Sequence, residues 1–305
     1  MTRVGIGLPQ ELDGGDAQRL AAYAHRAEEV GFDAVWVQDQ VFGRRPRSEP
    51  LVTLSSVAAH APHCQLGAAV AVVPGRHPVE LARLAATLQV LSGGRLVLGL
   101  AGGSAWTAAR LGIDPDQRLP MLREAVHLLR ELWSGAPVTV SGEHWSVDRA
   151  ILRAGNGPIN APRLMIGGGS PAALRFAAHS GDGWIGAGSS TTPAFERQLA
   201  RLRGELADRR ADADEFVVAK RLYFHVGRSD GDRRRVREWF TSYYGDASPA
   251  EAAVIGSIDD CAAAARRILE LGVDELILSP VIDEEAQLEF AAELLPLIRG
   301  PQPID

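Results

Sequence analysis

Cysteine is nearly absent from this chain of 305 residues, and basic residues are in the minority. The 32 Lys and Arg side chains are outnumbered by 38 Asp and Glu side chains, which gives a formal net charge of -6 at pH 7. The chain therefore lacks the basic excess with which proteins bind a nucleic-acid backbone, and nucleic acid is not an expected partner. Cys64 and Cys261 lie in neither a C-x-x-C nor a metal-ligand spacing, so we expect reduced thiols in a cytoplasmic protein.

Long apolar runs are also missing. No stretch reaches the roughly 18 apolar residues that a membrane-spanning helix requires, so a membrane is not an expected partner. The N-terminus enters an alternating strand pattern directly, without the apolar segment and small-residue cleavage site of a secretory signal. No pair of histidines forms a convincing metal site, and no metal is expected.

Strand patterns and helix patterns alternate along the chain. Short apolar or alternating runs predict strands at 3–9, 34–39, 66–73, 96–100, 164–166, 184–185, 217–226 and 275–278. Apolar residues at helical spacing predict helices at 17–30, 51–61, 79–91, 121–133, 172–179, 193–210, 231–244, 261–271 and 284–299. Strands that alternate with helices imply an α/β fold with a parallel sheet, either open or closed, and the strand count favours a (β/α)8 or TIM barrel.

Composition and length agree with one barrel. Hydrophobic residues make up 46% of the chain and charged residues 23%, which is typical of a globular protein with a large core. Because barrels of this kind run as one domain at roughly 200 to over 400 residues, we expect residues 1–305 to form a single domain. Segments 134–162 and 246–257 interrupt the alternation after the fourth and seventh strands, and we expect these insertions to form lids or binding loops.

A strand that runs into three glycines and then a helix is the strongest candidate for a binding site. Barrel active sites lie at the carboxyl ends of the strands, where Gly167, Gly168, Gly169, Ser170 and Pro171 fall. Ser170 suits the N-cap and Pro171 the first helical position, while the glycines let an anion approach backbone N–H groups at the positive end of the helix. The local sequence fits a phosphate site and a tight turn equally well, and it matches neither a Walker loop nor a dinucleotide fingerprint.

Two further segments of small residues are candidates for contact with a ligand. Gly99 and Gly102 fall where the fourth strand ends, and they would let a flat ring or a phosphate pack against the backbone. Ala68, Ala69 and Val70 leave open space on the inner wall of the third strand. Turn formation in the first segment and barrel packing in the second are the alternative explanations.

Three ionisable side chains are candidates for catalysis. Asp39 ends the second strand, where its carboxylate could accept a proton or could instead tie down a loop. His77 follows the third strand, and it either reaches the site or caps the next helix. His225 shares one face of the seventh strand with Tyr223, and it is either a catalytic group that faces the barrel interior or a hydrogen-bonded core residue.

Several short motifs follow one another along most of the chain. They are EEVGFDAVW at 28–36, LGAAV at 66–70, RHP at 76–78, LSGGRLVLG at 91–99, REAVHLLRELW at 123–133 with Gly142, IGGGS at 166–170 and GDGW at 181–184. No single motif is decisive, but their order and spacing resemble those of the bacterial luciferase-like monooxygenase superfamily. Members of that superfamily are flavin- and deazaflavin-dependent (β/α)8 barrels.

The resemblance implies where a cofactor would bind. Residues 168–170 would hold the cofactor phosphate, with Arg118 supplying a countercharge. The cofactor ring would lie across the barrel mouth against residues 68–70. In the family the third strand often carries a bulge with a non-prolyl cis peptide, which would fall here between Ala69 and Val70.

The chain also departs from the family pattern. Deazaflavin-using relatives commonly carry Asp-His after the second strand, whereas this chain has Asp39 followed by Gln40. The Gly-x-Gly expected after the fourth strand is replaced by residues 99–101, and the acidic residues that often follow are replaced by residues 105–109. These departures leave open both the identity of the acid or base and the choice between FMN and coenzyme F420.

A luciferase-like monooxygenase that uses reduced FMN and O2 on a small organic substrate is the leading functional hypothesis. It implies a separate flavin reductase as a partner, and dimers are common among relatives, so a homodimer is compatible with it. The alternative in the same fold is a dehydrogenase or reductase that moves a hydride with coenzyme F420. A non-catalytic barrel that binds a flavin or a phosphate ligand is the alternative of another class.

Overall fold

Parallel strands form a closed barrel in the computed structural model, which describes residues 2–11, 16–155, 159–207 and 215–299. The barrel strands are β1 (Arg3–Gly7), β2 (Ala34–Val37), β3 (Gln65–Val72), β4 (Leu96–Ala101), β7 (Arg163–Gly167), β8 (Gly183–Gly186), β9 (Val217–Val226) and β11 (Glu275–Pro280). Their hydrogen-bonded order is β9-β11-β1-β2-β3-β4-β7-β8, and β8 also pairs with β9, which closes the ring. The predicted (β/α)8 barrel is confirmed.

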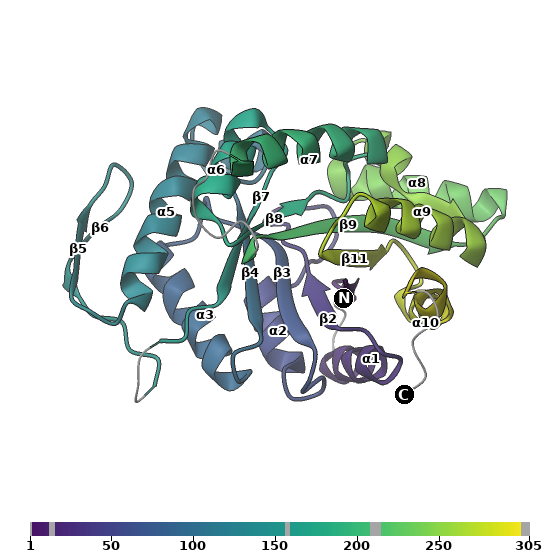
Figure 1. Ribbon diagram of the computed structural model, residues 1–305, viewed down its shortest axis with the longest axis horizontal. Coiled ribbons are helices and arrows are strands. Elements are labelled where there is room, and N and C mark those ends of the chain that lie inside the picture. The colour runs from purple at the N-terminus through teal and green to yellow at the C-terminus, as the bar shows by residue number, and fades with distance from the viewer. Residues whose placement is uncertain (1, 12–15, 156–158, 208–214, 300–305) are drawn as a thin grey trace.

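Helices surround these strands, as Figure 1 shows. They are α1 (Ala17–Glu29), α2 (Pro50–Val57), α3 (Pro78–Leu91), α5 (Arg118–Trp133), α6 (Pro171–Ser180), α7 (Thr192–Ala207), α8 (Asp230–Tyr244), α9 (Ile258–Glu270) and α10 (Glu284–Arg299). Every predicted helix is present, although α2 ends before the predicted boundary, at Val57. The predicted end of the 193–210 helix lies partly outside the described residues, which stop there at Ala207.

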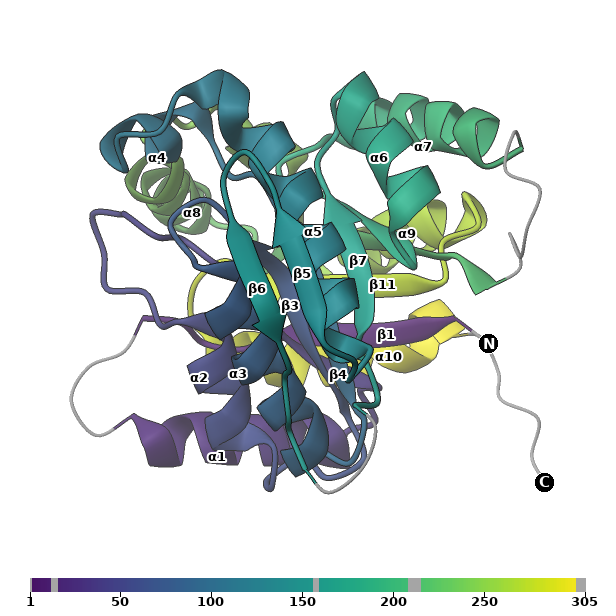
Figure 2. The ribbon, with the colours of Figure 1, turned by 90° about the vertical axis from the view of Figure 1, so that its left-hand side faces the viewer.

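Both predicted insertions are present, after the fourth and seventh barrel strands. The first contains an antiparallel hairpin of β5 (Val138–Ser141) and β6 (Ser146–Ala150), which projects from the barrel beside α5 in Figures 1 and 2. The second contains the 3-10 helix η3 (Ser248–Ala252) and β10 (Val254–Gly256), which adds to β9 in parallel. Between β4 and α5 lie a short helix, α4 (Ala105–Arg110), and the 3-10 turn η1 (Pro115–Gln117), which the sequence analysis did not predict.

Trp36 of β2 fills the interior of the barrel and is 2% exposed. Its indole packs over Gly5 and Gly67, where an added Cβ atom would lie 2.5 Å and 2.1 Å from atoms of the ring. Its Nε1 donates a hydrogen bond to Oε1 of Glu275 at 3.1 Å. Trp36 belongs to the same buried cluster as Ala69, so its ring packs on the side of β3 that faces the barrel interior.

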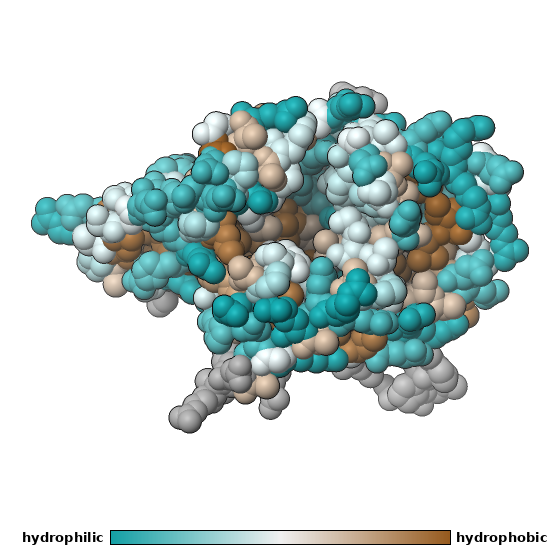
Figure 3. Space-filling model, turned by 90° about the horizontal axis from the view of Figure 1, so that it is seen from above, coloured by the Kyte–Doolittle hydropathy of each residue, from teal (hydrophilic) through white to brown (hydrophobic). Residues whose placement is uncertain are grey.

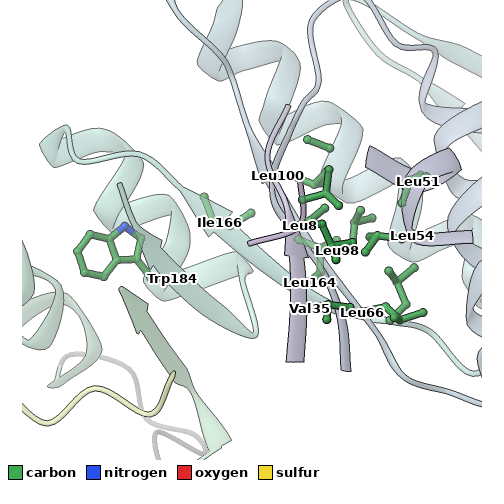
Figure 4. Packing of buried hydrophobic residues seen from close by; sticks show 14 of the residues in the cluster. Leu8, Val35, Leu51, Leu54, Leu66, Leu98, Leu100, Leu164, Ile166 and Trp184 are labelled. Atoms are coloured by element: carbon green, nitrogen blue, oxygen red, sulfur yellow. The ribbon is translucent and has the colours of Figure 1, made fainter. Parts of the chain in front are cut away.

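The larger part of the core lies between the strands and the helices. Leucines that point outward from the barrel, such as Leu66, Leu98 and Leu164, are 0% exposed. Figure 4 shows Leu51 and Leu54 of α2 on the other side of this layer, facing the strands. Side chains that alternate along each strand therefore pack either inside the barrel or between the strands and the helices. Packing on both sides holds the ends of the strands rigidly.

One face of the molecule is hollowed. Figure 3 shows apolar residues within this hollow and hydrophilic residues around it. Over the described ranges, no helix has both the length and the apolar character needed to cross a lipid bilayer.

Candidate functional site

A cleft of about 1190 Å³ opens where the barrel strands end. Its lining includes residues 38–44 after β2, residues 69, 70 and 72 of β3, residues 101–104, 167–170 and 185–187 at the ends of β4, β7 and β8, and residues 242–245 at the end of α8. Arg110 of α4, Arg118 at the start of α5 and Arg221 of β9 also line the cleft and add positive charge to its wall. The cleft thus occupies the position at which (β/α)8 barrels build their active sites.

The glycine-rich loop between β7 and α6 forms one wall of the cleft. Gly168 has a φ of +121°, and the Oγ of Ser170 accepts a hydrogen bond from the N–H of Ala173 at 3.2 Å, which caps α6. The indole Nε1 of Trp184 donates to the carbonyl of Gly168 at 2.8 Å and fixes the turn. The N–H groups of Gly169 and Ser170 donate to no group in the described chain, so they are free to bind an anion at this helix N-terminus.

Arg118 lies on the same cleft, as the sequence analysis expected. Its Nε donates to the carbonyl of Pro115 at 2.6 Å, and its Nη1 donates to the carbonyl of Gly103 at 2.7 Å. A Cβ atom on Gly102 would lie 3.0 Å from the carbonyl oxygen of Arg118, so glycine lets the loop after β4 pack against the start of α5. Among the described residues Arg118 has no carboxylate partner, and its positive charge remains available to a ligand.

Strand β3 carries the predicted bulge. Its register against β4 shifts between Ala68 and Ala71, and the peptide bond between Ala69 and Val70 is cis, as the resemblance implied. Ala69 and Val70 line the cleft. Ala68 and Gly99 do not line it, because they lie behind the bulge, where a Cβ atom on Gly99 would approach the carbonyl oxygen of Ala68 to 2.3 Å.

Asp39 lies on the cleft, but its carboxylate is engaged with the protein. Its Oδ2 accepts hydrogen bonds from the N–H of Val72 at 2.8 Å and from Nη2 of Arg76 at 2.6 Å. Nη1 of Arg76 in turn donates to Oε1 of Glu49 at 2.7 Å. Asp39 therefore ties together the loops after β2 and β3, which favours its structural interpretation over that of a proton acceptor.

The two candidate histidines lie away from the cleft lining. His77 caps α3, because its Nδ1 accepts a hydrogen bond from the N–H of Val79 at 3.3 Å. His225 lies where β9 has passed the barrel and pairs with β10, and its Nε2 is 3.7 Å from Oδ1 of Asp232. Burial lowers the pKa of His225. The structure brings neither histidine to Asp39.

Arg221 is a site residue that the sequence analysis missed. It is 9% exposed, and its Nη1 donates to the carbonyl of Ala69 at 3.0 Å and to Oε1 of Gln38. Its Nη2 donates to the hydroxyl of Tyr223 at 2.8 Å, and that hydroxyl donates to Gln38. No carboxylate in the described chain pairs with Arg221, which leaves a buried positive charge beside the β3 bulge.

Tyr244, the last residue of α8, brings a phenol to this positive charge. Its hydroxyl lies 3.0 Å from that of Tyr223 and accepts a hydrogen bond from Nη2 of Arg221 at 3.4 Å. Gln40 occupies the place of the family histidine, and its Nε2 donates to the carbonyl of Tyr243 at 2.6 Å. Gln40 therefore holds the end of α8 in place, and a tyrosine beside an arginine provides the ionisable hydroxyl of the site.

Within the residues that the structure describes, no group of three or more His, Cys, Asp or Glu side chains could hold a metal ion. The Tyr244 hydroxyl beside Arg221 can support proton transfer, and the loop and the bulge can support binding of a phosphorylated ring.

Comparison with known families agrees with this arrangement. A family model described as luciferase-like monooxygenase matches residues 2–271. A solved structure of an F420-dependent secondary alcohol dehydrogenase in complex with an F420-acetone adduct has a TM-score of 0.83 and 20% sequence identity, with 98% of this chain and 99% of that chain covered. At this identity the structural similarity supports the fold alone.

Comparison with individual sequences gives closer relatives. An F420-dependent glucose-6-phosphate dehydrogenase of Beutenbergia cavernae is 31% identical over 321 residues, which cover 92% of this chain and 93% of that protein. An enzyme of the same name from Kineococcus radiotolerans is 34% identical over 177 residues, which cover 55% of this chain and 51% of that protein. With the Kineococcus protein and two others of that name, the match spans between 51% and 66% of the relative's length.

Proposed function

Because the chain belongs to the luciferase-like monooxygenase family of oxidoreductases, we propose that it is a coenzyme F420-dependent dehydrogenase or reductase of a small organic substrate. The sequence relatives support this alternative better than the FMN-dependent monooxygenase, since both relatives described above depend on F420 by name. A flavin reductase partner would belong only to the monooxygenase alternative. The observation that carries the proposal is that the phosphate loop and the β3 bulge line one cleft.

The cleft contains groups that fit a phosphorylated deazaflavin. The free N–H groups of Gly169 and Ser170 would bind the phosphate, and Arg118 would supply the countercharge. The bulge at Ala69 and Val70 would support one face of the ring. When bound, the deazaflavin supplies a carbon atom that accepts or donates a hydride, and the protein has to orient the substrate and manage the proton.

We assign the proton to Tyr244. Oxidation of an alcohol by hydride loss also releases the hydroxyl proton, so a base has to lie beside the substrate oxygen. Tyr244 lines the cleft, and the Arg221 guanidinium stabilises the negative charge of the Tyr244 phenolate, which becomes a neutral phenol when it takes up the substrate proton. The hydroxyl of Tyr223 holds that oxygen in place through the 3.0 Å contact.

Titration of the purified protein with F420 and with FMN tests the proposal. F420 fluorescence should report saturable binding with a micromolar dissociation constant, and FMN should bind at least about tenfold more weakly. Tight FMN binding without F420 binding would favour the monooxygenase. Binding of neither cofactor would leave the non-catalytic phosphate-binding barrel as the better explanation.

A further inference from the structure

A row of arginines extends from the cleft along the outer side of α8. A shallow groove of about 670 Å³ is lined by Arg44, Arg233, Arg234, Arg237, Glu238, Thr241, Ser242 and Ala247. Arg44 and Ser242 also line the cleft, so the groove and the cleft are continuous. Arg234, Arg237, Thr241 and Tyr244 are spaced by three, four and three residues, which places them along one side of the helix. The row therefore leads from solvent to the hydroxyl to which we assign the proton.

The four arginines of the groove form no close ion pair among the described residues, although the charge of Arg233 reaches Asp260 and helps to lower the pKa of that carboxyl. Arg44, Arg233, Arg234 and Arg237 form neither an ion pair nor a side-chain hydrogen bond with any described residue. The adjacent arginines behave differently, since Arg45 pairs with Glu11 at 2.9 Å and Arg235 pairs with Asp283 at 2.6 Å. A solvated helix surface would not by itself gather four arginines without a close ion pair around one hollow. Glu238 supplies the acidic charge of the groove lining.

The groove carries a net positive charge, whereas the whole chain has a formal net charge of -6. Clustered positive charge at the mouth of a cleft raises the local concentration of anions and speeds their entry. A guanidinium also binds phosphate and carboxylate groups through two parallel N–H bonds, which makes arginine suited to hold such a group at a fixed position. The glycine-rich loop at α6 already accounts for the cofactor phosphate, and different elements build the groove.

We propose that the substrate is an anion that carries a phosphate or carboxylate group, and that Arg44, Arg234 and Arg237 bind this group at the rim of the cleft. The inference rests on the proposed function, because it names the substrate class of the same site. The anionic end binds in the groove, and the reacting end extends past Ser242 to Tyr244 and the bulge.

Calorimetric titration with inorganic phosphate tests the groove directly. The protein is first saturated with F420, so that the loop at residues 168–170 is occupied, and the ionic strength is held constant. Phosphate should bind the wild type with a dissociation constant on the order of a millimolar. The double variant Arg234→Gln, Arg237→Gln should bind it at least about tenfold more weakly. Arg197→Gln is the matched control, because Arg197 is exposed on α7 and forms no ion pair among the described residues.

Three results would overturn the inference. They are an absence of phosphate binding to the loaded wild type, equal phosphate affinity in the folded double variant, and a loss of F420 affinity in that variant. The last result would assign the groove to the acidic side chain of the cofactor. If F420 does not bind the wild type, the proposed function fails. Phosphate titration of the cofactor-free wild type and of the cofactor-free double variant then still tests the groove.

Discussion

Arg221 donates a hydrogen bond from Nη1 to the carbonyl oxygen of Ala69 at 3.0 Å, although the two residues are 152 positions apart in the chain. The contact fixes a buried positive charge against the cis peptide between Ala69 and Val70, within the β3 bulge. Because the cofactor ring is proposed to lie on this bulge, Arg221 would affect both the shape and the charge of the surface beneath the ring.

The first prediction concerns Arg221. Arg221→Gln removes the charge and cannot reach Ala69, Gln38 and Tyr223 at once, so F420 affinity should fall by about tenfold. Arg221→Lys keeps the charge without the planar fork and should give an intermediate affinity. Fluorescence titration measures both values, and an affinity equal to wild type in a folded Arg221→Gln protein would contradict the role assigned here.

The second prediction concerns Tyr244. Tyr244→Phe removes the phenol oxygen that takes up the substrate proton, so kcat should fall by roughly a hundredfold or more while F420 affinity is unchanged. Tyr23→Phe is the control, because the buried Tyr23 hydroxyl has no hydrogen-bond partner in the part of the chain that is described. Steady-state kinetics and the pH profile of kcat measure the effect. A Tyr244→Phe enzyme with wild-type kcat would exclude this tyrosine as the base.

The third prediction separates the phosphate loop from helix capping. Ser170→Ala should cost about 1 kcal/mol of stability through loss of the α6 cap, and it should also weaken F420 binding. Ser257→Ala removes an equivalent cap from α9, where the Ser257 Oγ accepts from the N–H of Asp260, and it should leave F420 binding intact.

Binding of the F420 chromophore without its phosphate completes this comparison. Its affinity should be the same in the wild type and in Ser170→Ala, because the loop contacts only the phosphate. If Ser170→Ala weakened both molecules equally, the loop would be a tight turn rather than a phosphate site.

The fourth prediction is a dependence of stability on pH through Glu275. Burial raises the pKa of this carboxyl from its ordinary value of 4.5 to about 7, and the nearby Arg3 opposes the shift only in part. A raised pKa in the folded state means that the folded chain holds the proton more tightly than the unfolded chain does. The resulting stabilisation is complete below pH 4.5 and is lost as the pH rises through 7.

Glu275→Gln tests this sign. The amide stays neutral and can still accept the hydrogen bond from Nε1 of Trp36. Urea unfolding should therefore show the variant and the wild type to be equally stable at pH 4.5, and the variant to be more stable at pH 8 by on the order of 2 kcal/mol. A variant that is less stable at pH 8 would mean that the ion pair with Arg3 outweighs burial.

The barrel could be predicted from the sequence because its strands and helices have different periodicities, and almost every element falls where these patterns place it. Helix α4 was missed for a physical reason. It has only six residues, and Ala108 is the one that is buried, so it carries no apolar stripe. Its sequence signal was Ser104, whose Oγ accepts from the N–H of Thr107 as an N-cap does.

The site was predictable where it is built from continuous segments. The loop at residues 167–170 follows one strand, and the position of the bulge followed from the family resemblance. The sequence could not decide the role of Asp39, because its partner Arg76 lies 37 residues away. Alternation along the seventh strand left His225 as either a catalytic group facing the barrel interior or a core residue, and the structure shows it buried where β9 continues past the barrel to pair with β10. Arg221 and Ala69 meet only because the barrel brings β9 and β3 to the same interior.

The hydrogen bond from Trp184 to the carbonyl of Gly168 makes the phosphate loop observable through a side chain of the protein itself. Six tryptophans in the chain give at most six indole N–H signals in a nitrogen-correlated NMR spectrum. The indole nitrogen of Trp184 donates its hydrogen bond to the turn that would bind the phosphate. The indole nitrogen of Trp36 donates its hydrogen bond to Glu275, deep in the barrel. Binding of a phosphate to the loop would thus shift the indole resonance of Trp184, and the indole resonance of Trp36 would serve as an internal reference.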